Sequence, residues 1–448
     1  MYLKTALPAE HFRHETGHCW FIDCAGIGLD KLKKGGLIPR VTVFEDGRPI
    51  GPSNAIHDEI RYHGYGRVAV TGGRLYFSTS DNTDPRSNGR EYVVEATQHD
   101  DGTPLPPPRV MHVAITGSCN MTCRICRTED NAHGATIKDP VLDKVIAEAL
   151  PHLQELRLDS AGETTLHKPK FRLMVSQAAR HGVPVFMCTN AVLIDEEMAD
   201  FICKDTSVKR IQVSCDSPDR ETLEWIRRGA NYDELLAGIR NLVAARKRHD
   251  RPDILINMHA AIMAQNVDQQ ADLIRLAHEL GVDQVSTMFC SIHEYMDADW
   301  SVYWHQQRNN DATDEAARVA ADLGINYRPW GRFDLAAKPD STTPTQEATA
   351  LCYQLQHWTY LDPNGIIRPC CISPNFALGD LNVKTFTEVW HGEEYEELRR
   401  TYDTDHPSNP TCAKCYIRVG WNQNSYKSYF ASDHWPKVRQ RLGLPDLV

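Results

Sequence analysis

Short apolar segments alternate with amphipathic helical ones from Val110 to about Trp330, and this alternation constrains the fold more than any other feature of the sequence. Strands that alternate with helices along a chain pair in parallel, through right-handed crossovers. The segment is therefore predicted to form an α/β fold, a partial barrel of six strand–helix units, with functional residues at the carboxyl ends of the strands. The predicted strands are Val110–Thr116, Leu156–Asp159, Val185–Thr189, Ile211–Cys215, Ile254–Met263 and Gln284–Met288.

Two helices of this segment carry recognisable ends. Asn231 is followed three residues later by Glu234, an arrangement typical of a helix N-terminus. A second helix is predicted to end at Gly281, because glycine tolerates the left-handed backbone that closes many helices.

The flanks of the chain differ from this barrel segment. With 448 residues the chain is too long for one ordinary domain, so two or three units are expected. Residues 1–96 alternate in hydropathy between Gly, Asp and Asn turn signals, which predicts a β-rich N-terminal domain. Residues 97–109 are acidic and rich in proline, as in a linker. Residues 345–448 hold clustered cysteines and are predicted to form a small third domain with a C-terminal tail.

Charge and hydropathy exclude several classes of protein. The net charge is −11 and no run rich in lysine and arginine stands out, which argues against a nucleic-acid partner. No apolar run is long enough to cross a membrane and the first residues lack a signal-peptide pattern, so we expect a cytoplasmic protein without a membrane partner. In a reducing compartment, fourteen cysteines more often bind metal or carry out redox chemistry than form disulfides.

Three cysteines stand directly after the first predicted strand, at Cys119, Cys123 and Cys126. Three thiolates on one loop suit a cubane iron–sulfur cluster, which proteins bind through cysteine sulfur. Three ligands for four irons leave one iron open to a chelating small molecule. The alternatives from the residues alone are a structural zinc knuckle that lacks one ligand and three unrelated core thiols.

The CX3CX2C spacing after a first strand resembles the defining motif of the radical S-adenosylmethionine (SAM) superfamily, and DSAGETTLHKP, CTNA and QVSCDSPDRETLEWIRRG resemble further family segments in the same order. The resemblance implies a [4Fe–4S] cluster on the three cysteines, with SAM at its open iron. It implies that Gly162 and Glu163 hold the methionine amino end of SAM and that Asn190 lies near its ribose. Ser214 and Arg227 are implied to meet the ribose or the carboxylate.

Three positions depart from the family pattern. Ala161 replaces the first glycine of its GGE segment, Thr164 replaces the proline that follows, and Ile125 stands where an aromatic residue often precedes the third cysteine. These departures bear on the adenine and backbone contacts of SAM and not on the cluster.

Four further cysteines lie in the last quarter of the chain, at Cys352, Cys370, Cys412 and Cys415. A predicted hairpin around Asp362–Gly365 brings the first two together, and CAKC adds a close pair after the helical segment EEYEELRRTY. Four thiolates complete a closed metal site, for which structural zinc is the plain interpretation without other context.

The stretch around these cysteines resembles the SPASM/Twitch region that follows many radical SAM barrels. No cysteine follows Cys415, so the resemblance implies the shorter version with a single auxiliary [4Fe–4S] cluster, and two clusters in the whole chain. Cys371 is left over as a packed thiol or as a hydrogen-atom donor. Cys188, Cys203 and Cys215 are interpreted as ordinary core residues.

The chemistry implied by the resemblance is a 5′-deoxyadenosyl radical that abstracts a hydrogen atom, after one electron from a reductant such as flavodoxin or ferredoxin. The leading hypothesis is an oxidoreductase that dehydrogenates a small polar substrate, a sugar or sugar-like metabolite, with the auxiliary cluster as electron acceptor. Relatives with a single auxiliary cluster include a dehydrogenase that oxidises an aminocyclitol alcohol. The N-terminal segment YFSTSDNTDPRSNGREY has a composition suited to carbohydrate contacts.

Three alternatives stay open. The first is a maturase of ribosomal peptides, although residues 1–96 lack the helices of a winged-helix leader-binding module. The second is an epimerase in which Cys371 or Cys290 donates a hydrogen atom. The third is a metal-bound scaffold without enzymatic activity, which would give the constellation of Glu163, Asn190 and Arg227 no purpose.

Overall fold

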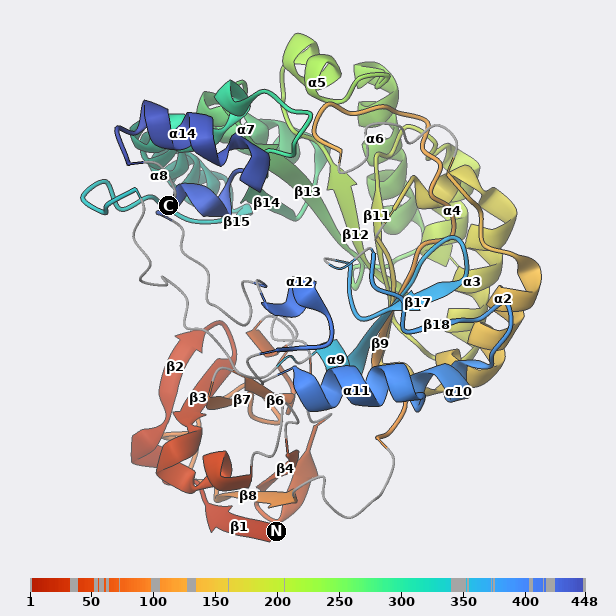
Figure 1. Ribbon diagram of the computed structural model, residues 1–448, viewed down its shortest axis with the longest axis vertical. Helices are drawn as coiled ribbons and strands as arrows, with labels where there is room; N and C mark the ends of the chain where they lie inside the picture. Colours follow the sequence, from red (N-terminus) through yellow and green to blue (C-terminus); the bar gives the residue numbers. More distant parts are fainter. Residues whose placement is uncertain are drawn as a thin grey trace.

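The strands of the described residues form three β-sheets, one of ten strands and two of four. In Figure 1 the large sheet and its helices form the upper body, and the two small sheets form the lower one. The computed structural model describes residues 2–32, 39–51, 55, 60–61, 64–71, 73–97, 105–126, 134–159, 161–204, 206–339, 352, 354–371, 373, 375–402, 406–413, 415 and 424–445.

The ten-stranded sheet contains all six predicted strands, paired in parallel and in chain order, which confirms the α/β partial barrel. A seventh parallel strand that the sequence analysis did not predict, β15 (Asn326–Arg328), extends the sheet beyond β14. The six predicted strands are β9 (Val110–Val113), β10 (Glu155–Leu158), β11 (Val185–Thr189), β12 (Val208–Ser214), β13 (Leu255–Ile262) and β14 (Gln284–Phe289).

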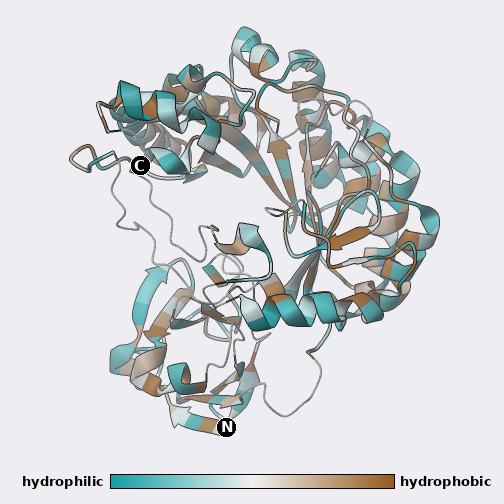
Figure 2. Cartoon of the chain, viewed as in Figure 1, coloured by the Kyte–Doolittle hydropathy of each residue, from teal (hydrophilic) through white to brown (hydrophobic). Residues whose placement is uncertain are grey.

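The two faces of this sheet meet different surroundings, because successive side chains of a strand point to opposite sides. One face packs against the helices in an apolar core that includes Met111, Leu156 and Ile211. Figure 2 shows hydrophilic residues on the outer surfaces of these helices. The other face carries His112, Arg157 and other polar side chains, and we call it the inner wall. The helices are α2 (Asp139–Lys144), α3 (Lys168–Arg180), α4 (Glu196–Lys204), α5 (Arg220–Ile226), α6 (Tyr232–Arg248), α7 (Gln270–Leu280) and α8 (Gln306–Leu323).

Both predicted helix ends are confirmed. The Asn231 side chain accepts hydrogen bonds from the backbone N–H groups of Asp233 and Glu234 at the start of α6. Helix α7 ends at Gly281, whose φ is +75°. In the part of the chain that the structure describes, no helix has the length and apolar character needed to cross a membrane.

Helix α6 approaches the loop after β11 closely enough to require a glycine. A Cβ atom built on Gly238 would lie 2.0 Å from the carbonyl oxygen of Ala191. Ala191 itself is fully buried and has a φ of +62°, a backbone conformation that residues other than glycine rarely adopt. The contact therefore fixes the loop that carries Asn190.

The Gly238→Ala variant should be destabilised by roughly 1–3 kcal/mol or more, because the backbone of Ala191 leaves the new methyl group no room. Helix propensity alone predicts the opposite effect, because alanine in place of glycine within a helix raises stability by about 1 kcal/mol. Urea unfolding measures the difference. The control is Gly26→Ala, whose new Cβ would meet nothing within 4 Å. Equal stability of Gly238→Ala and the parent would contradict the contact.

The cysteine-bearing C-terminal segment continues the barrel sheet. Strands β16 (Trp358–Leu361) and β17 (Ile366–Arg368) form the predicted hairpin, in which Gly365 has a φ of +88°. Strand β16 pairs in parallel with β9, so this segment is joined to the barrel by backbone hydrogen bonds. Its other elements are β18 (Gly379–Asp380), α9 (Gln354–His357), α10 (Phe386–Trp390), α11 (Glu393–Thr401), α12 (Pro410–Ala413) and α14 (Trp435–Arg441).

The N-terminal region is β-rich, as predicted, and its strands form the two small antiparallel sheets. The predicted linker between it and the barrel lies partly outside the described residues. One sheet contains β1 (Tyr2–Ala6), β8 (Tyr92–Thr97), β4 (Arg40–Glu45) and β5 (Arg48–Ile50). The other contains β2 (Arg13–Thr16), β3 (Cys19–Asp23), β7 (Arg74–Phe77) and β6 (Val68–Thr71).

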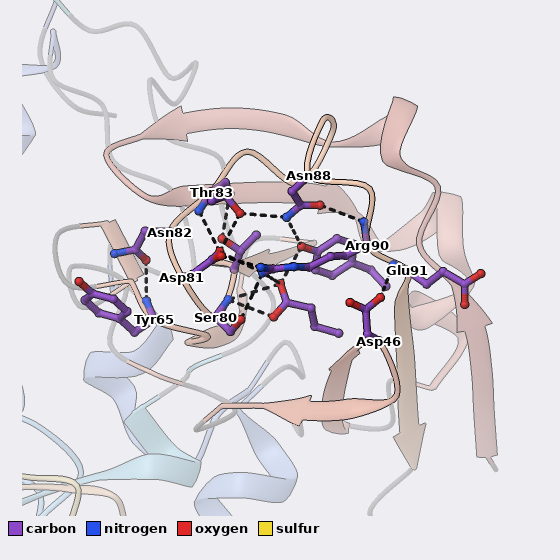
Figure 3. A network of polar contacts seen from close by, with 12 residues as sticks. Asp46, Tyr65, Ser80, Asp81, Asn82, Thr83, Asn88, Arg90 and Glu91 are labelled. Atoms are coloured by element: carbon purple, nitrogen blue, oxygen red, sulfur yellow. Dashed lines mark hydrogen bonds and ion pairs between the residues drawn. The ribbon is translucent and has the colours of Figure 1, made fainter.

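The polar segment between β7 and β8 hydrogen-bonds extensively with itself and with β4 (Figure 3). Arg90 contacts Asp81 at 2.5 Å and the buried Glu45 at 3.1 Å. Tyr92 donates a hydrogen bond of 2.8 Å to the same Glu45 carboxylate. Asn88 donates to the hydroxyl oxygens of Thr83 and Tyr92. Internal bonding of this kind gives the composition of the segment a structural explanation, so it supplies no independent support for carbohydrate binding.

Candidate active site

A cavity of about 270 Å³ lies at the carboxyl ends of the first four barrel strands. It is lined by every residue that the sequence analysis assigned to the first cluster and to SAM, although these residues come from four separate loops. The lining residues are Cys119, Met121, Cys123, Cys126, Leu158, Asp159, Ala161, Gly162, Glu163, Thr164, Cys188, Thr189, Asn190, Ser214 and Arg227.

The loop that carries the three cysteines is held by backbone hydrogen bonds. Thr122 N–H donates to the carbonyl oxygen of Arg228, and Arg124 N–H donates to that of Ile226, both at 2.8 Å. No three side chains among the described residues form a ready-made group of metal ligands. The fit to an iron–sulfur cluster rests instead on the donor set, three thiols on one tethered loop around one cavity.

Gly162 lets the loop after β10 lie directly on the cysteine loop. Its φ is +59°, and an added Cβ would lie 2.3 Å from the carbonyl oxygen of Ser118 and 2.5 Å from that of Thr116. The next residue, Glu163, donates its backbone N–H to the Ser118 carbonyl at 2.9 Å. The glycine is therefore required for packing against the cluster loop.

The Glu163 carboxylate is buried and held in one orientation. Its Oε1 accepts hydrogen bonds from the hydroxyls of Thr165 and Thr189, at 2.6 and 2.8 Å. Its Oε2 accepts one from the backbone N–H of Asn190, at 2.7 Å. These donors, from the loops after β10 and β11, fix an anionic group at the cavity wall without an ion-pair partner among the described residues.

Asn190 connects the loop after β11 to the cysteine loop. Its Nδ2 donates a hydrogen bond of 2.7 Å to Asn120 Oδ1, and its Oδ1 accepts one from the backbone N–H of Val192. The side chain is thus oriented by its neighbours at the cavity wall. Asn120, its partner on the cysteine loop, was not singled out from the sequence.

Arg227 is paired with an acidic residue that the sequence analysis missed. Its Nε lies 2.7 Å from Oδ2 of Asp216, whose side chain is fully buried. Burial lowers the pKa of Arg227, but Asp216, Cys123 and Cys215 together raise it by more, so the net shift is upward and the guanidinium stays charged. Asp216 Oδ1 also accepts a hydrogen bond from the backbone N–H of Ala261. Both partners stand in the quoted segment QVSCDSPDRETLEWIRRG, so the signal was present in the sequence.

The inner wall next to the cavity carries a buried charged group. His112 Nδ1 lies 2.7 Å from Asp159 Oδ1, and Arg157 Nε donates to Asp159 Oδ2 at 3.1 Å. The Arg157 guanidinium also lies 4.2 Å from the centroid of the Phe186 ring. Buried charges cost free energy that an apolar core would not, so their presence beside a cavity indicates a site for polar chemistry.

A ladder of side-chain amides continues this wall across β12 to β15. Asn257 donates to Gln212, Gln284 donates to Asn257, and Asn326 donates to Gln284, with distances of 3.1 to 3.3 Å. Such groups both donate and accept hydrogen bonds and match the hydroxyl groups of a polar ligand.

His259 lies beside this ladder on the inner wall, with Nδ1 2.9 Å from Ser286 Oγ. Burial lowers the pKa of His259 to about 4. The imidazole is therefore neutral at neutral pH and adds polarity to the wall without adding charge.

Cys188 is not an ordinary core residue. It lies on β11 beside Gln212 of β12, faces the inner wall and lines the cavity. Burial raises the pKa of its thiol well above the usual value, so it is protonated at neutral pH. Cys203, on α4, and Cys215, directly after β12, do lie in the apolar core, as predicted. The face on which a strand residue lies depends on register, which a short apolar run does not reveal.

The second set of cysteines lies on several elements of the C-terminal segment, with Cys412 on α12. Cys352 and Cys412 are buried in one core with Tyr402. Cys415 N–H donates to the carbonyl oxygen of Cys412, at 3.3 Å.

The loop of Cys370 is tied to the start of α12. Ser373 N–H donates to the Cys370 carbonyl oxygen, and Ser373 Oγ accepts a hydrogen bond of 2.8 Å from Asn409 Nδ2. Asn409 directly precedes α12, which carries Cys412. The structure thus connects the chain segment that carries Cys370 to the one that carries Cys412 and Cys415.

Two further cysteines were considered as hydrogen-atom donors. Cys290 is buried in the apolar core and does not line the cavity. Cys371 is half-buried and lies near Tyr360, on the C-terminal hairpin rather than at the cavity.

Family models match both cysteine regions. The model of the Radical SAM superfamily matches residues 113–260, and that of the iron–sulfur cluster-binding domain SPASM matches residues 352–416. The ranges include the loop of the first three cysteines and all four of the second set.

Individual relatives are distant. The chain is 23% identical over 329 residues to the tungsten-containing aldehyde ferredoxin oxidoreductase cofactor-modifying protein of Pyrococcus furiosus, covering 69% of this chain and 88% of that protein. It is 27% identical over 180 residues to GTP 3′,8-cyclase of Rhodococcus opacus, covering 39% of this chain and 49% of the cyclase.

The fold resembles that of SuiB from Streptococcus suis, solved with S-adenosylmethionine bound. The TM-score is 0.53 at 15% identity, and the match covers 72% of this chain and 78% of SuiB. At this identity the likeness concerns the fold and not the substrate.

Proposed function

Because this chain is a radical SAM enzyme with a C-terminal SPASM region, we propose that it oxidises a small polar substrate, a sugar or sugar-like metabolite, held against the inner wall. The observation that carries this proposal is the continuity between the cysteine-lined cavity and that wall, because Asp159 belongs to both. A chamber lined with charged and amide side chains favours a substrate rich in hydrogen-bonding groups.

The roles of the cavity residues follow from their places. Cys119, Cys123 and Cys126 would hold a [4Fe–4S] cluster. Cluster and SAM, when bound, supply a 5′-deoxyadenosyl radical that abstracts a hydrogen atom from the substrate. The buried Glu163 carboxylate would accept a charge-assisted hydrogen bond from the SAM ammonium, and Gly162 keeps that carboxylate against the cluster loop.

The remaining cavity residues bind and orient. Asn190 and Ser214 would contact the SAM ribose. The Asp216 carboxylate neutralises and fixes Arg227, so the guanidinium would present its remaining N–H groups to the ribose or the carboxylate of SAM.

The second cysteine set would hold the electron acceptor. We assign Cys352, Cys370, Cys412 and Cys415 to a single fully ligated [4Fe–4S] cluster. A cluster without an open iron transfers electrons and does not bind substrate, which suits an oxidation. Fourteen cysteines, none in a disulfide, also suit a reducing compartment, so we place the enzyme in the cytoplasm with flavodoxin or ferredoxin as reductant.

Glu163→Gln should weaken SAM binding about tenfold or more, since a charge-assisted hydrogen bond contributes roughly 1.5–3 kcal/mol. Isothermal titration of the reconstituted enzyme measures the dissociation constant. Glu197→Gln is the matched control, because Glu197 is an exposed helix residue paired with Arg172. Unchanged SAM affinity in Glu163→Gln would show that this carboxylate does not bind the ammonium.

The reaction itself is tested with a panel of aldoses, uronic acids, aminocyclitols and short peptides. The substrate should raise 5′-deoxyadenosine formation above the rate without substrate and yield a product two hydrogens lighter. A product of unchanged mass that gains one solvent-derived hydrogen would make the enzyme an epimerase. Stimulation by a peptide alone would make it a maturase.

A further inference from the structure

Tyr402 follows α11 and buries a hydroxyl group that has no oxygen or nitrogen hydrogen-bond partner among the residues that the structure describes. Its side chain is 1% exposed. A buried hydroxyl without a partner costs roughly 1–3 kcal/mol, so native structures rarely retain one without a reason. No oxygen or nitrogen acceptor among the described residues satisfies this hydroxyl.

The surroundings of this hydroxyl are sulfur atoms. Burial raises the pKa of the Tyr402 phenol, and the neighbouring Cys352, Cys415 and Cys412 raise it further, Cys352 also through a side-chain hydrogen bond. Cys352 and Cys412 also belong to the same packed core as Tyr402. Three of the four cysteines assigned to the second cluster therefore act electrostatically on one buried hydroxyl donor.

Other buried tyrosines of the same region are satisfied by the protein. Tyr395 Oη lies 2.8 Å from Thr359 Oγ1. Tyr426 Oη accepts a hydrogen bond of 3.0 Å from Arg439. Tyr402 differs from both, because its hydroxyl has no oxygen or nitrogen partner among the described residues.

We propose that the Tyr402 hydroxyl donates a hydrogen bond to a cysteine sulfur of the C-terminal cluster and thereby raises the reduction potential of that cluster. The inference rests on the cysteine assignment made for the proposed function. Hydrogen bonds to cluster sulfurs are one of the factors that set the potential. A donor stabilises the reduced state, which carries more negative charge, so the cluster becomes a better electron acceptor.

The test uses the Cys119/Cys123/Cys126→Ala background, in which only the second cluster contributes to the electron paramagnetic resonance signal. In this background Tyr402→Phe should lower the ratio of reduced to oxidised cluster at a fixed potential roughly tenfold, which is about 59 mV for one electron. Tyr426→Phe is the control, because it removes an equally buried hydroxyl from the same region and should leave the potential unchanged.

Two outcomes separate this inference from the cluster assignment. Loss of all iron from the background variant, rather than the expected half, would overturn the assignment and the inference with it. An iron content equal to that of the background, with an unchanged potential, in Tyr402→Phe would overturn the role of the hydroxyl alone. If Tyr402→Phe fails to assemble the cluster, 3-fluorotyrosine is placed at position 402 instead. Its hydroxyl is a more acidic donor, so the reduction potential of the cluster should rise. An unchanged potential would overturn the inference.

Discussion

Replacing Cys119, Cys123 and Cys126 together by alanine should abolish SAM cleavage and remove about half of the iron and acid-labile sulfide from the anaerobically reconstituted protein. These cysteines share one loop and one cavity, and no other described cysteine of that cavity except Cys188 could replace them. The second set lies on several elements of the C-terminal segment, so its cluster should assemble independently.

Iron and sulfide analysis, together with liquid chromatography of 5′-deoxyadenosine, measures this result. The control is Cys371→Ala, which should retain the full iron content because Cys371 belongs to neither assigned set. Retention of all iron in the triple variant would contradict the assignment of the first cluster. Zinc in place of iron at the second set would contradict the auxiliary cluster.

Replacing Cys352 and Cys412 by alanine should separate hydrogen abstraction from oxidation. The cavity and its SAM contacts are left intact, so SAM cleavage should continue, while formation of the oxidised product should fall at least tenfold because the second electron loses its acceptor. Deuterated substrate measures the two steps separately, since deuterium still enters 5′-deoxyadenosine when only the second step is lost.

Folding is the main alternative explanation for lost activity in this variant. Cys352 and Cys412 are buried in the core, and a four-thiolate site also contributes folding free energy. Circular dichroism must therefore accompany the assay, with Cys203→Ala as a control for the loss of a buried thiol outside both assigned sets. A folded variant that still forms oxidised product at the parental rate would rule out the C-terminal cluster as electron acceptor.

Sequence reasoning reached the barrel and the site loops because each leaves a local signal. Apolar periodicity marks the six strands, and the cysteine spacing and the segment DSAGETTLHKP mark two loops of the cavity. The helix ends at Asn231 and Gly281 were predictable for the same reason, since capping depends on a few adjacent residues.

Other features depend on pairing between distant segments and leave no local signal. The register of β11 places Cys188 on the inner wall, whereas the sequence pattern around Cys188 predicted a core residue. The ion pair of Asp216 with Arg227 forms only when α5 follows β12 at the correct angle. The parallel pairing of β16 with β9 joins segments about 250 residues apart. Nothing in the sequence of either strand indicates which strand it pairs with.

The central claim is that this chain cleaves SAM reductively within the cysteine-lined cavity. The most direct test is to reduce the reconstituted wild-type enzyme with dithionite, without substrate, and to quantify 5′-deoxyadenosine and methionine. The account predicts slow release of both in equal amounts, and none from the Cys119/Cys123/Cys126→Ala variant. Release of neither product from a wild-type enzyme that contains its full complement of iron and sulfide would contradict it.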